Sequence, residues 1–206
     1  MKKNRFTIIV VGLIVLAIIL IGVLQASKSD RLNMEPVEDQ RLIYQGDQSA
    51  DNEMLFLFDY ACHWCTTWMN DVYPTIKSDY IDTGELKFRT QAMVYVNDTS
   101  LQLANLDQNL KAHAEEDYLD VFQQIIADSE LDLDGLSWGS EYYISEVIDS
   151  YQLDSELMLA QPDLDSIQLS RTYTRALEVD AVPTIYINGL KVEDAFNLEQ
   201  IDKLIK

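Results

Sequence analysis

The two cysteines of this chain, Cys62 and Cys65, are separated by only two residues, His63 and Trp64. They follow the apolar run Met54 to Phe58, where a buried strand is expected to lead into a helix. Two thiols at this spacing can form and break a disulfide, and the 206-residue chain has no third cysteine to compete with them. The sequence therefore favours thiol redox chemistry at this point.

Cys62 is predicted at the N-terminus of that helix, where unpaired backbone N–H groups and the helix dipole favour negative charge. Cysteines in such positions have a pKa below that of a free cysteine, and a positive charge on His63 is expected to lower it further. A thiol with a low pKa is a good leaving group, so the disulfide would act as an oxidant. Cys65 would be the sheltered resolving sulfur. Trp64 either shapes contact with a substrate or only covers the end of the helix.

Other uses of the two cysteines need weighing. Tetrahedral zinc needs two further ligands, and His63 could hardly turn towards a metal held by both flanking cysteines, so a metal site is not expected. A permanent disulfide across so short a loop would constrain the unfolded chain little. A copper-handling module built from Cys62, Cys65 and a methionine such as Met69 is an alternative of another class. Dithiol exchange itself needs no cofactor.

The first 26 residues predict a cytoplasmic tail and a membrane anchor. Three basic residues precede Phe6 to Leu24, a run of nineteen residues without charge. A helix of that length, at about 1.5 Å per residue, matches the hydrocarbon core of a bilayer. The basic flank predicts a cytoplasmic N-terminus, with the rest of the chain outside. A cleaved signal peptide is the alternative, but its apolar region is usually shorter.

All 35 acidic residues follow this apolar run, together with 12 of the 15 basic residues. Such an acidic surface repels nucleic acid and anionic lipid headgroups, so nucleic-acid binding is not expected. We interpret the acidic excess as solvation of an extracytoplasmic surface.

Residues 27–40 are polar, contain Pro36 and lack apolar periodicity, which predicts a tether before a single domain at residues 41–206. The domain is expected to begin with two strands, a helix that Pro74 kinks, and a third strand with the polar alternation of a sheet edge. These elements correspond to Arg41 to Gln45, Met54 to Phe58, Cys62 to Tyr80 and Glu85 to Val96.

Helical periodicity dominates residues 99–178, and we expect a block of about four helices there, with Asp128 to Ser140 as a loop. Asn188-Gly189 between two β-type runs predicts a hairpin, and Leu198 to Ile205 predicts a terminal helix. The order of elements indicates an α/β domain with a mixed sheet and an all-helical insertion.

A second motif, Val182-Pro183-Thr184, lies just before the first hairpin strand. Proline there could be an ordinary strand entry. Together with the cysteine pair, however, the motif resembles the thioredoxin superfamily. With Phe58-Asp59-Tyr60, the helical block and Ile187-Asn188-Gly189, the chain resembles the DsbA-like thiol-disulfide oxidoreductases, especially their membrane-anchored relatives. The resemblance covers residues 41–206 and implies a thioredoxin-like fold with an all-helical insertion, preceded by the transmembrane anchor.

By this resemblance, Cys62 is the solvent-facing nucleophile, Cys65 is its partner, and Pro183 follows a cis peptide bond. Backbone groups of Val182 would pair with an extended substrate. The resemblance implies an extracytoplasmic enzyme that introduces disulfides into cysteine-containing secreted or envelope proteins, and a quinone-linked membrane oxidase that reoxidises it. A reductase or isomerase kept reduced by a membrane donor is the alternative.

Two positions depart from the family pattern. His63 stands where many relatives have proline, and the residues between the cysteines tune the reduction potential. Phe56 stands six residues before Cys62, where relatives often have a buried acid. Proton transfer to Cys65 would then fall to Asp59 or to water, although Asp59 can equally be a solvated turn residue.

Overall fold

The computed structural model describes residues 13, 15–17, 34–38, 42–131 and 137–205. The chain divides into two compact units, Met1–Leu32 and Asn33–Lys206. Among the described residues, no helix has the length and apolar character needed to cross a membrane. The predicted anchor, Phe6 to Leu24, lies almost entirely outside the described residues, so it stays a prediction.

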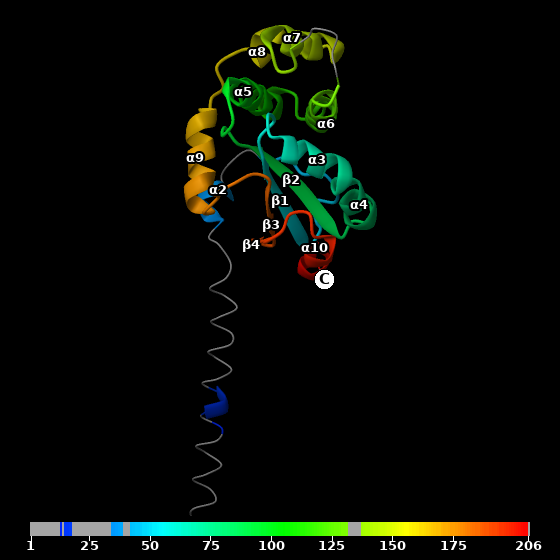
Figure 1. Ribbon diagram of the computed structural model, residues 1–206, viewed down its shortest axis with the longest axis vertical. Helices are drawn as coiled ribbons and strands as arrows, with labels where there is room; N and C mark the ends of the chain where they lie inside the picture. The colour runs from blue at the N-terminus through cyan, green and yellow to red at the C-terminus, as the bar shows by residue number, and fades with distance from the viewer. Residues whose placement is uncertain (1–12, 14, 18–33, 39–41, 132–136, 206) are drawn as a thin grey trace, which may run out of the picture. The chain divides into compact units, whose positions relative to one another are not determined.

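A four-stranded mixed sheet forms the centre of the second unit (Figure 1). Its order is β2-β1-β3-β4, with β1 parallel to β2 and antiparallel to β3. The central strand β1 is buried on both faces, which explains its uninterrupted apolar run. The strands are β1 (Asn52–Phe58), β2 (Leu86–Ala92), β3 (Thr184–Ile187) and β4 (Leu190–Lys191).

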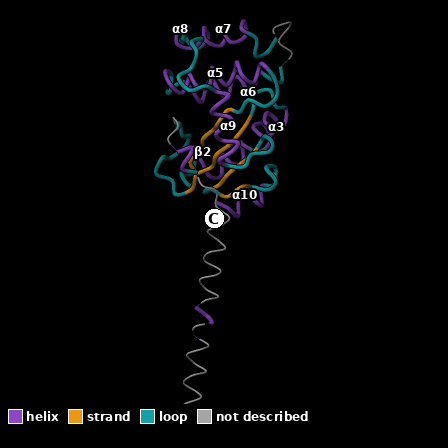
Figure 2. Tube along the Cα trace, turned by 90° about the vertical axis from the view of Figure 1, so that its left-hand side faces the viewer, coloured by secondary structure: helices purple, strands orange, loops and turns teal. Residues whose placement is uncertain are grey.

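Helices cover both faces of this sheet. On one face, α3 (His63–Asp71) places Trp68 against Phe56 of β1, with the ring centroids 4.4 Å apart. On the other face, which is turned to the viewer in Figure 2, α9 (Ser166–Ala176) lies across the strands. The edge position of β2 agrees with its polar alternation. Its Arg89 is nevertheless buried and pairs with Glu53 at 2.7 Å.

Pro74 divides the helix that the sequence predicts as one. The first part, α3, ends at Asp71, and α4 (Tyr73–Ile76) holds Pro74 in its first turn. A π-helical segment, η1 (Lys77–Ile81), continues the chain. Proline lacks the N–H group that a continuous helix would need, so the helix is interrupted there.

The sequence predicts a first strand at Arg41 to Gln45. This prediction is wrong for residues 42–44, which form no strand, and only an isolated β-bridge at Gln45 remains. Gln45 and Phe88 exchange two backbone hydrogen bonds of 2.8 and 2.9 Å. The chain then turns at Gly46, which has φ of +94°. A side chain at this position would meet the carbonyl oxygen of Leu86 at 2.8 Å, so glycine is required and pairing stops here.

The tether predicted over residues 27–40 also differs from the structure in its described part. Glu35–Glu38 form a short helix, α2, which packs against α9, and Val37 is completely buried. The Tyr173 hydroxyl donates to the carbonyl oxygen of Val37 at 3.4 Å. Burial of this one apolar side chain outweighs the polar composition around it, so packing starts before residue 41.

A block of helices connects β2 to β3, and apart from α9 it lies at one end of the sheet (Figure 1). Its first helix begins at a capping box, in which the Asn97 side chain accepts from the backbone N–H of Ser100. Besides α9, the block contains α5 (Asp98–His113), α6 (Tyr118–Asp128), α7 (Glu141–Ser150) and α8 (Ser155–Met158).

The C-terminal elements agree with the sequence pattern. Asn188 and Gly189 have φ of +53° and +78°, which gives the tight turn between β3 and β4. The terminal helix, α10 (Leu198–Ile205), has the predicted bounds and buries Ile201 and Ile205. Both signals are local in sequence, and this explains why they were readable.

A buried ion pair ties the helical block to the rest of the unit. Asp107 and Lys111, one turn apart on α5, are 0% and 3% exposed and lie 2.8 Å apart. Asp107 also accepts hydrogen bonds from the hydroxyls of Tyr60 and Tyr118, and Lys111 donates to the carbonyl oxygen of Thr90. The network therefore joins α5 and α6 to β2 and to the loop after β1.

Replacing Lys111 with methionine should destabilise the protein, because the Asp107 carboxylate would stay buried without its cation. We expect the free energy of unfolding, measured by urea titration, to fall by about 3–5 kcal/mol. Lys203→Met is the matched control, since Lys203 pairs with Glu199 at the same spacing but on an exposed surface. Its effect should stay below about 1 kcal/mol, and equal effects of the two substitutions would contradict this role of the buried pair.

Candidate active site, a dithiol at the start of α3

Cys62 is the N-cap residue of α3, with extended backbone angles of φ −89° and ψ 110°. Its carbonyl oxygen accepts from the backbone N–H groups of Cys65 and Thr66 at 2.9 and 3.2 Å. Its sulfur is partly exposed and lies 3.6 Å from the carbonyl oxygen of Val182. The position predicted from the sequence is confirmed, because β1 delivers Cys62 directly to the positive end of the helix.

The environment of Cys62 lowers its pKa from 9.0 to about 6. The largest cause is the hydrogen bond from the Cys65 thiol, and backbone N–H groups of Cys65 and Trp64 lower the pKa further. Burial and the charge of Asp59 act in the opposite direction. Cys62 is therefore mainly a thiolate at neutral pH.

Cys65 lies one turn further into α3 and is completely buried. Burial raises the pKa of its thiol far above the ordinary value, and the hydrogen bond to Cys62 raises it further. The pair thus holds one proton, which resides on the inner sulfur. This asymmetry suits an outer sulfur that exchanges with substrates and an inner sulfur that is released as a thiol.

Asp59 is fully buried, so its interpretation as a solvated turn residue is wrong. One carboxylate oxygen accepts from the N–H of Ala61 at 2.9 Å, and the other accepts from Tyr95 and Val96 at 2.7 and 3.1 Å. Asp59 therefore ties the loop before Cys62 to the segment after β2. Its charge raises the pKa of both cysteines.

His63 and Trp64 both lie on the surface of the first turn of α3. The main influences on the Cys62 pKa do not include His63, so the sequence-based expectation for its charge is not supported. Trp64 is 61% exposed and makes an edge contact with Phe196, with the ring centroids 6.2 Å apart. The exposed ring presents an apolar surface beside the dithiol.

Val182 and Pro183 are partly buried beside the dithiol, and the peptide bond between them is cis, as the resemblance implied. Phe56 fills the position of the expected acid and is completely buried. It stacks on Trp68, so that position offers packing and no proton acceptor.

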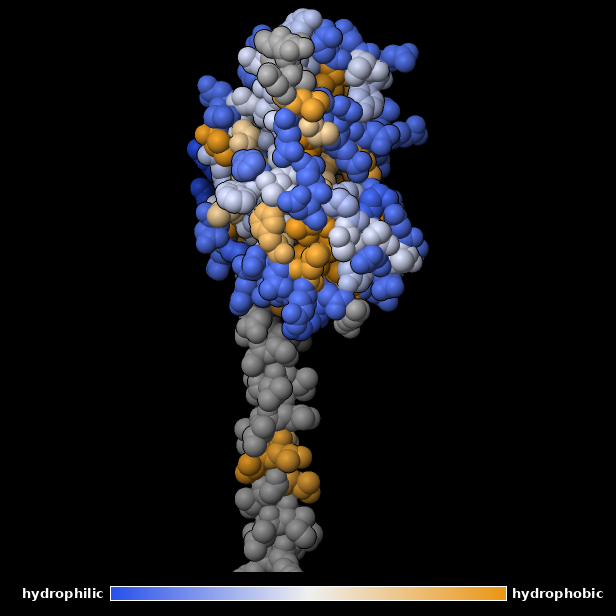
Figure 3. Space-filling model, turned by 45° about the vertical axis from the view of Figure 1, so that its right-hand side comes forward, coloured by the Kyte–Doolittle hydropathy of each residue, from blue (hydrophilic) through white to orange (hydrophobic). Residues whose placement is uncertain are grey.

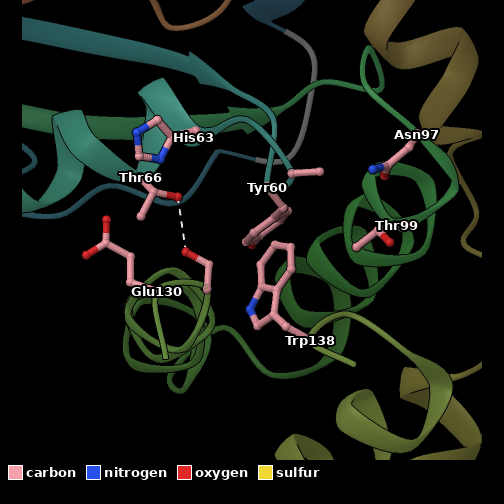
Figure 4. A pocket seen from close by; sticks show the side chains of 9 residues that line it. Tyr60, His63, Thr66, Asn97, Thr99, Glu130 and Trp138 are labelled. Carbon is pink, nitrogen blue, oxygen red and sulfur yellow. Dashed lines mark hydrogen bonds between the residues drawn. The ribbon is translucent and has the colours of Figure 1, made fainter. Parts of the chain in front are cut away.

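Two features of the site escaped the sequence reasoning. Phe196, the contact of Trp64, comes from a short loop without any periodic signal. A cavity of about 380 Å³ lies between the starts of α3 and α5 and the loop after α6 (Figure 4). Ala61 and His63, the neighbours of Cys62 in sequence, line it together with Trp138. The lone tryptophan in the predicted acidic loop was the signal that could have indicated it.

A thioredoxin family model matches residues 38–206 of the chain. The chain is 21% identical over 171 residues to disulfide bond formation protein D of Bacillus subtilis (strain 168). The aligned region covers 78% of this chain and 74% of that protein. It is 22% identical, over an alignment of 219 residues, to probable disulfide bond formation protein D of Bacillus cereus (strain ATCC 14579), with 100% of both proteins covered.

Solved structures share the fold. Oxidised BdbD from Bacillus subtilis superposes with a TM-score of 0.66 and 17% identity, over 85% of this chain and 94% of that one. DsbA from Chlamydia trachomatis gives a TM-score of 0.67 and 16% identity, over 82% and 92%. These likenesses show the fold. The family match shows that the chain belongs to the thioredoxin family, and with the two relatives and the dithiol at the start of α3 it is a DsbA-like thiol-disulfide oxidoreductase.

Proposed function

We propose that the protein is a membrane-anchored extracytoplasmic oxidase that donates a Cys62–Cys65 disulfide to cysteine-containing secreted or envelope proteins. The low pKa of Cys62 is the observation that carries this proposal. A stabilised thiolate favours the reduced pair over the disulfide, so the disulfide readily accepts electrons. The names of the two Bacillus relatives, both disulfide bond formation proteins, support the same direction.

The reaction proceeds in two exchanges. A substrate thiolate attacks the Cys62 sulfur, the bond to Cys65 breaks, and Cys65 takes up a proton because its pKa is high. The second substrate thiolate then attacks the substrate's own sulfur in this mixed disulfide and displaces Cys62 as a thiolate. The substrate loses two electrons and two protons. The protein gains both electrons and one proton, and the other proton enters solvent.

The surroundings of Cys62 offer a place for an extended substrate. The carbonyl oxygen of Val182 lies 3.6 Å from the sulfur, and a backbone that paired with Val182 would bring its cysteine to Cys62. Trp64 and Phe196 add exposed apolar surface. The surface in Figure 3 is largely hydrophilic but also bears apolar side chains, which an unfolded substrate can cover.

The sequence supports the proposed location of the protein. The basic flank and the apolar run up to Leu24 support an anchor with the catalytic unit outside the cell membrane. Reoxidation then needs a partner that removes two electrons, and a quinone-linked oxidase in the same membrane supplies this chemistry. The acidic excess of the chain gives no support for a nucleic-acid partner.

The thiolate should make the stability of the reduced protein depend on pH. The folded pKa of Cys62, about 6, lies below its ordinary value of 9.0, so folding stabilises the thiolate. The reduced protein should therefore gain stability over the oxidised one as the pH rises from 6 to 9, and lose this gain as the pH falls through 6. Urea unfolding of both forms across this range measures the difference.

Ultraviolet absorbance of the thiolate gives the Cys62 pKa directly, with His63→Ala as the comparison. We expect wild type to titrate near pH 6 and His63→Ala to stay close to it, because the sulfur is stabilised by Cys65 and backbone groups. Titration of the wild type near 9.0, the ordinary value, would refute the proposed oxidant.

Substitution of each cysteine should separate their roles. Cys65→Ser leaves Cys62 able to form a mixed disulfide that no internal thiol resolves, so partner proteins should accumulate as covalent complexes. Cys62→Ser should capture none and should abolish thiol oxidation. Non-reducing electrophoresis of cells expressing each variant measures the complexes, and equal capture by both variants would contradict the assignment.

The reduction potential distinguishes an oxidase from a reductase. Equilibration of the purified protein with glutathione should give a value nearer about −120 mV than about −270 mV. A value near about −270 mV would favour a reductase or isomerase kept reduced by a membrane donor.

A further inference from the structure

We propose that the cavity beside the dithiol binds a basic side chain, arginine or lysine, of the protein substrate that reacts at Cys62. This inference rests on the proposed function in that the substrate is a polypeptide thiol. It adds a specificity-determining site, which is formed by the start of α3 together with the helical block.

The cavity lies where a residue near the reacting cysteine can reach it. Ala61 and His63 immediately precede and follow Cys62, and both line the cavity. The opposite wall comes from the helical block, where Trp138 and Glu130 lie (Figure 4). Cys62 itself does not line the cavity, so the part of the substrate that would enter it is a side chain near the cysteine bonded to Cys62.

Several walls of the cavity have already used their hydrogen-bond donors. The Tyr60 hydroxyl donates to Asp107 at 3.0 Å, and the indole N–H of Trp138 donates to the carbonyl oxygen of Ile125 at 2.9 Å. Tyr60 is only 1% exposed, so its ring offers little surface, whereas the half-buried indole of Trp138 lines the cavity without a free donor. An aromatic face attracts a cation and offers nothing to an anion.

The hydroxyls of Thr66 and Ser129, joined by the dashed line in Figure 4, have also used their donors. Ser129 donates its proton to the carbonyl oxygen of Ile126 at 2.7 Å. In the 3.1 Å contact between Thr66 and Ser129, the donor must then be Thr66. Both oxygens keep only lone pairs for a ligand, so they can accept hydrogen bonds but not donate them.

Glu130 sets the sign of charge in the cavity. It is exposed, and no lysine or arginine within the described part of the chain pairs with it. Residues 132–136, which follow it, include no basic residue in the sequence. Donors remain on His63, Asn97 and Thr99, but the acceptors, the indole of Trp138 and the carboxylate together favour a cation.

The position of Trp138 is fixed by its neighbour Gly139. This glycine has φ of +74°, and a Cβ atom there would collide with the side-chain methyl of Thr99 on α5. The turn can therefore press against α5 and hold the indole in the cavity wall. A guanidinium that stacks on this ring and pairs with Glu130 would use both features at once.

Matched peptides test the proposal. Each peptide contains one cysteine, with arginine or its uncharged isostere citrulline placed in turn at each neighbouring position. The rate of reaction with the oxidised full-length protein is followed by formation of the mixed disulfide. For at least one position, arginine should accelerate the reaction about fivefold relative to citrulline.

Glu130→Gln and Glu156→Gln form a matched pair, because both remove one exposed carboxylate and only Glu130 lines the cavity. The preference for arginine should persist in Glu156→Gln and fall below about twofold in Glu130→Gln. Trp138→Leu should also reduce it. Equal loss in both glutamine variants, or no preference in wild type, would overturn the proposal.

A second readout does not depend on redox chemistry. The arginine peptide with serine in place of cysteine is titrated into the protein, and the indole N–H resonance of Trp138 is followed by NMR. A shift that Glu130→Gln weakens supports the site, and an unmoved resonance refutes it. If both peptide types fail to react while this shift is present, the proposed function fails and the cavity site stands.

Discussion

The unequal burial of the two sulfurs is the constraint on which the chemistry depends. Cys62 caps α3 and stays partly exposed, whereas Cys65 lies on the face of α3 that packs into the core and is buried. A low dielectric around the inner sulfur keeps its proton in place, and that proton stabilises the charge on the outer sulfur. The difference in burial along one helical turn therefore assigns a separate role to each cysteine.

Two buried carboxylates hold the loop that carries this turn. Asp59 accepts three backbone N–H groups and fixes the loop to the segment after β2. Asp107 reaches the same loop through the Tyr60 hydroxyl and is neutralised by Lys111. A buried carboxylate is costly without such partners, so the loop, the sheet and the helical block must come together in one arrangement. The loop that carries Cys62 is consequently held by contacts both to the segment after β2 and to α5 of the helical block.

The sequence was informative wherever a signal is local. The dithiol at a strand-to-helix junction, the Asn188-Gly189 turn and the terminal helix each depend on adjacent residues. Prediction was weaker where distant contacts decide the outcome. The bridge of Gln45 to Phe88 replaces a strand, and burial of Val37 against α9 orders part of the predicted tether.

The environment of the site was harder to predict than its reactive atoms. The effect expected of His63 required knowledge of where its ring lies, which spacing alone does not give. The cavity has walls from three segments far apart in sequence, and Trp138 joins them only through the packing of its turn on α5. Composition and periodicity describe residues close in sequence, so they cannot predict that these three segments meet at one cavity.

The shape of the sheet has a consequence for a protein whose proposed partners are incompletely folded chains. Such chains expose unpaired backbone, and a long bare strand at either margin would invite them to add on and aggregate. Here β4 consists of two residues, and Gln45 occupies part of the outer side of β2. One edge strand is therefore very short and the other is partly covered. Incompletely folded substrates thus find little free strand edge on which to pair and aggregate.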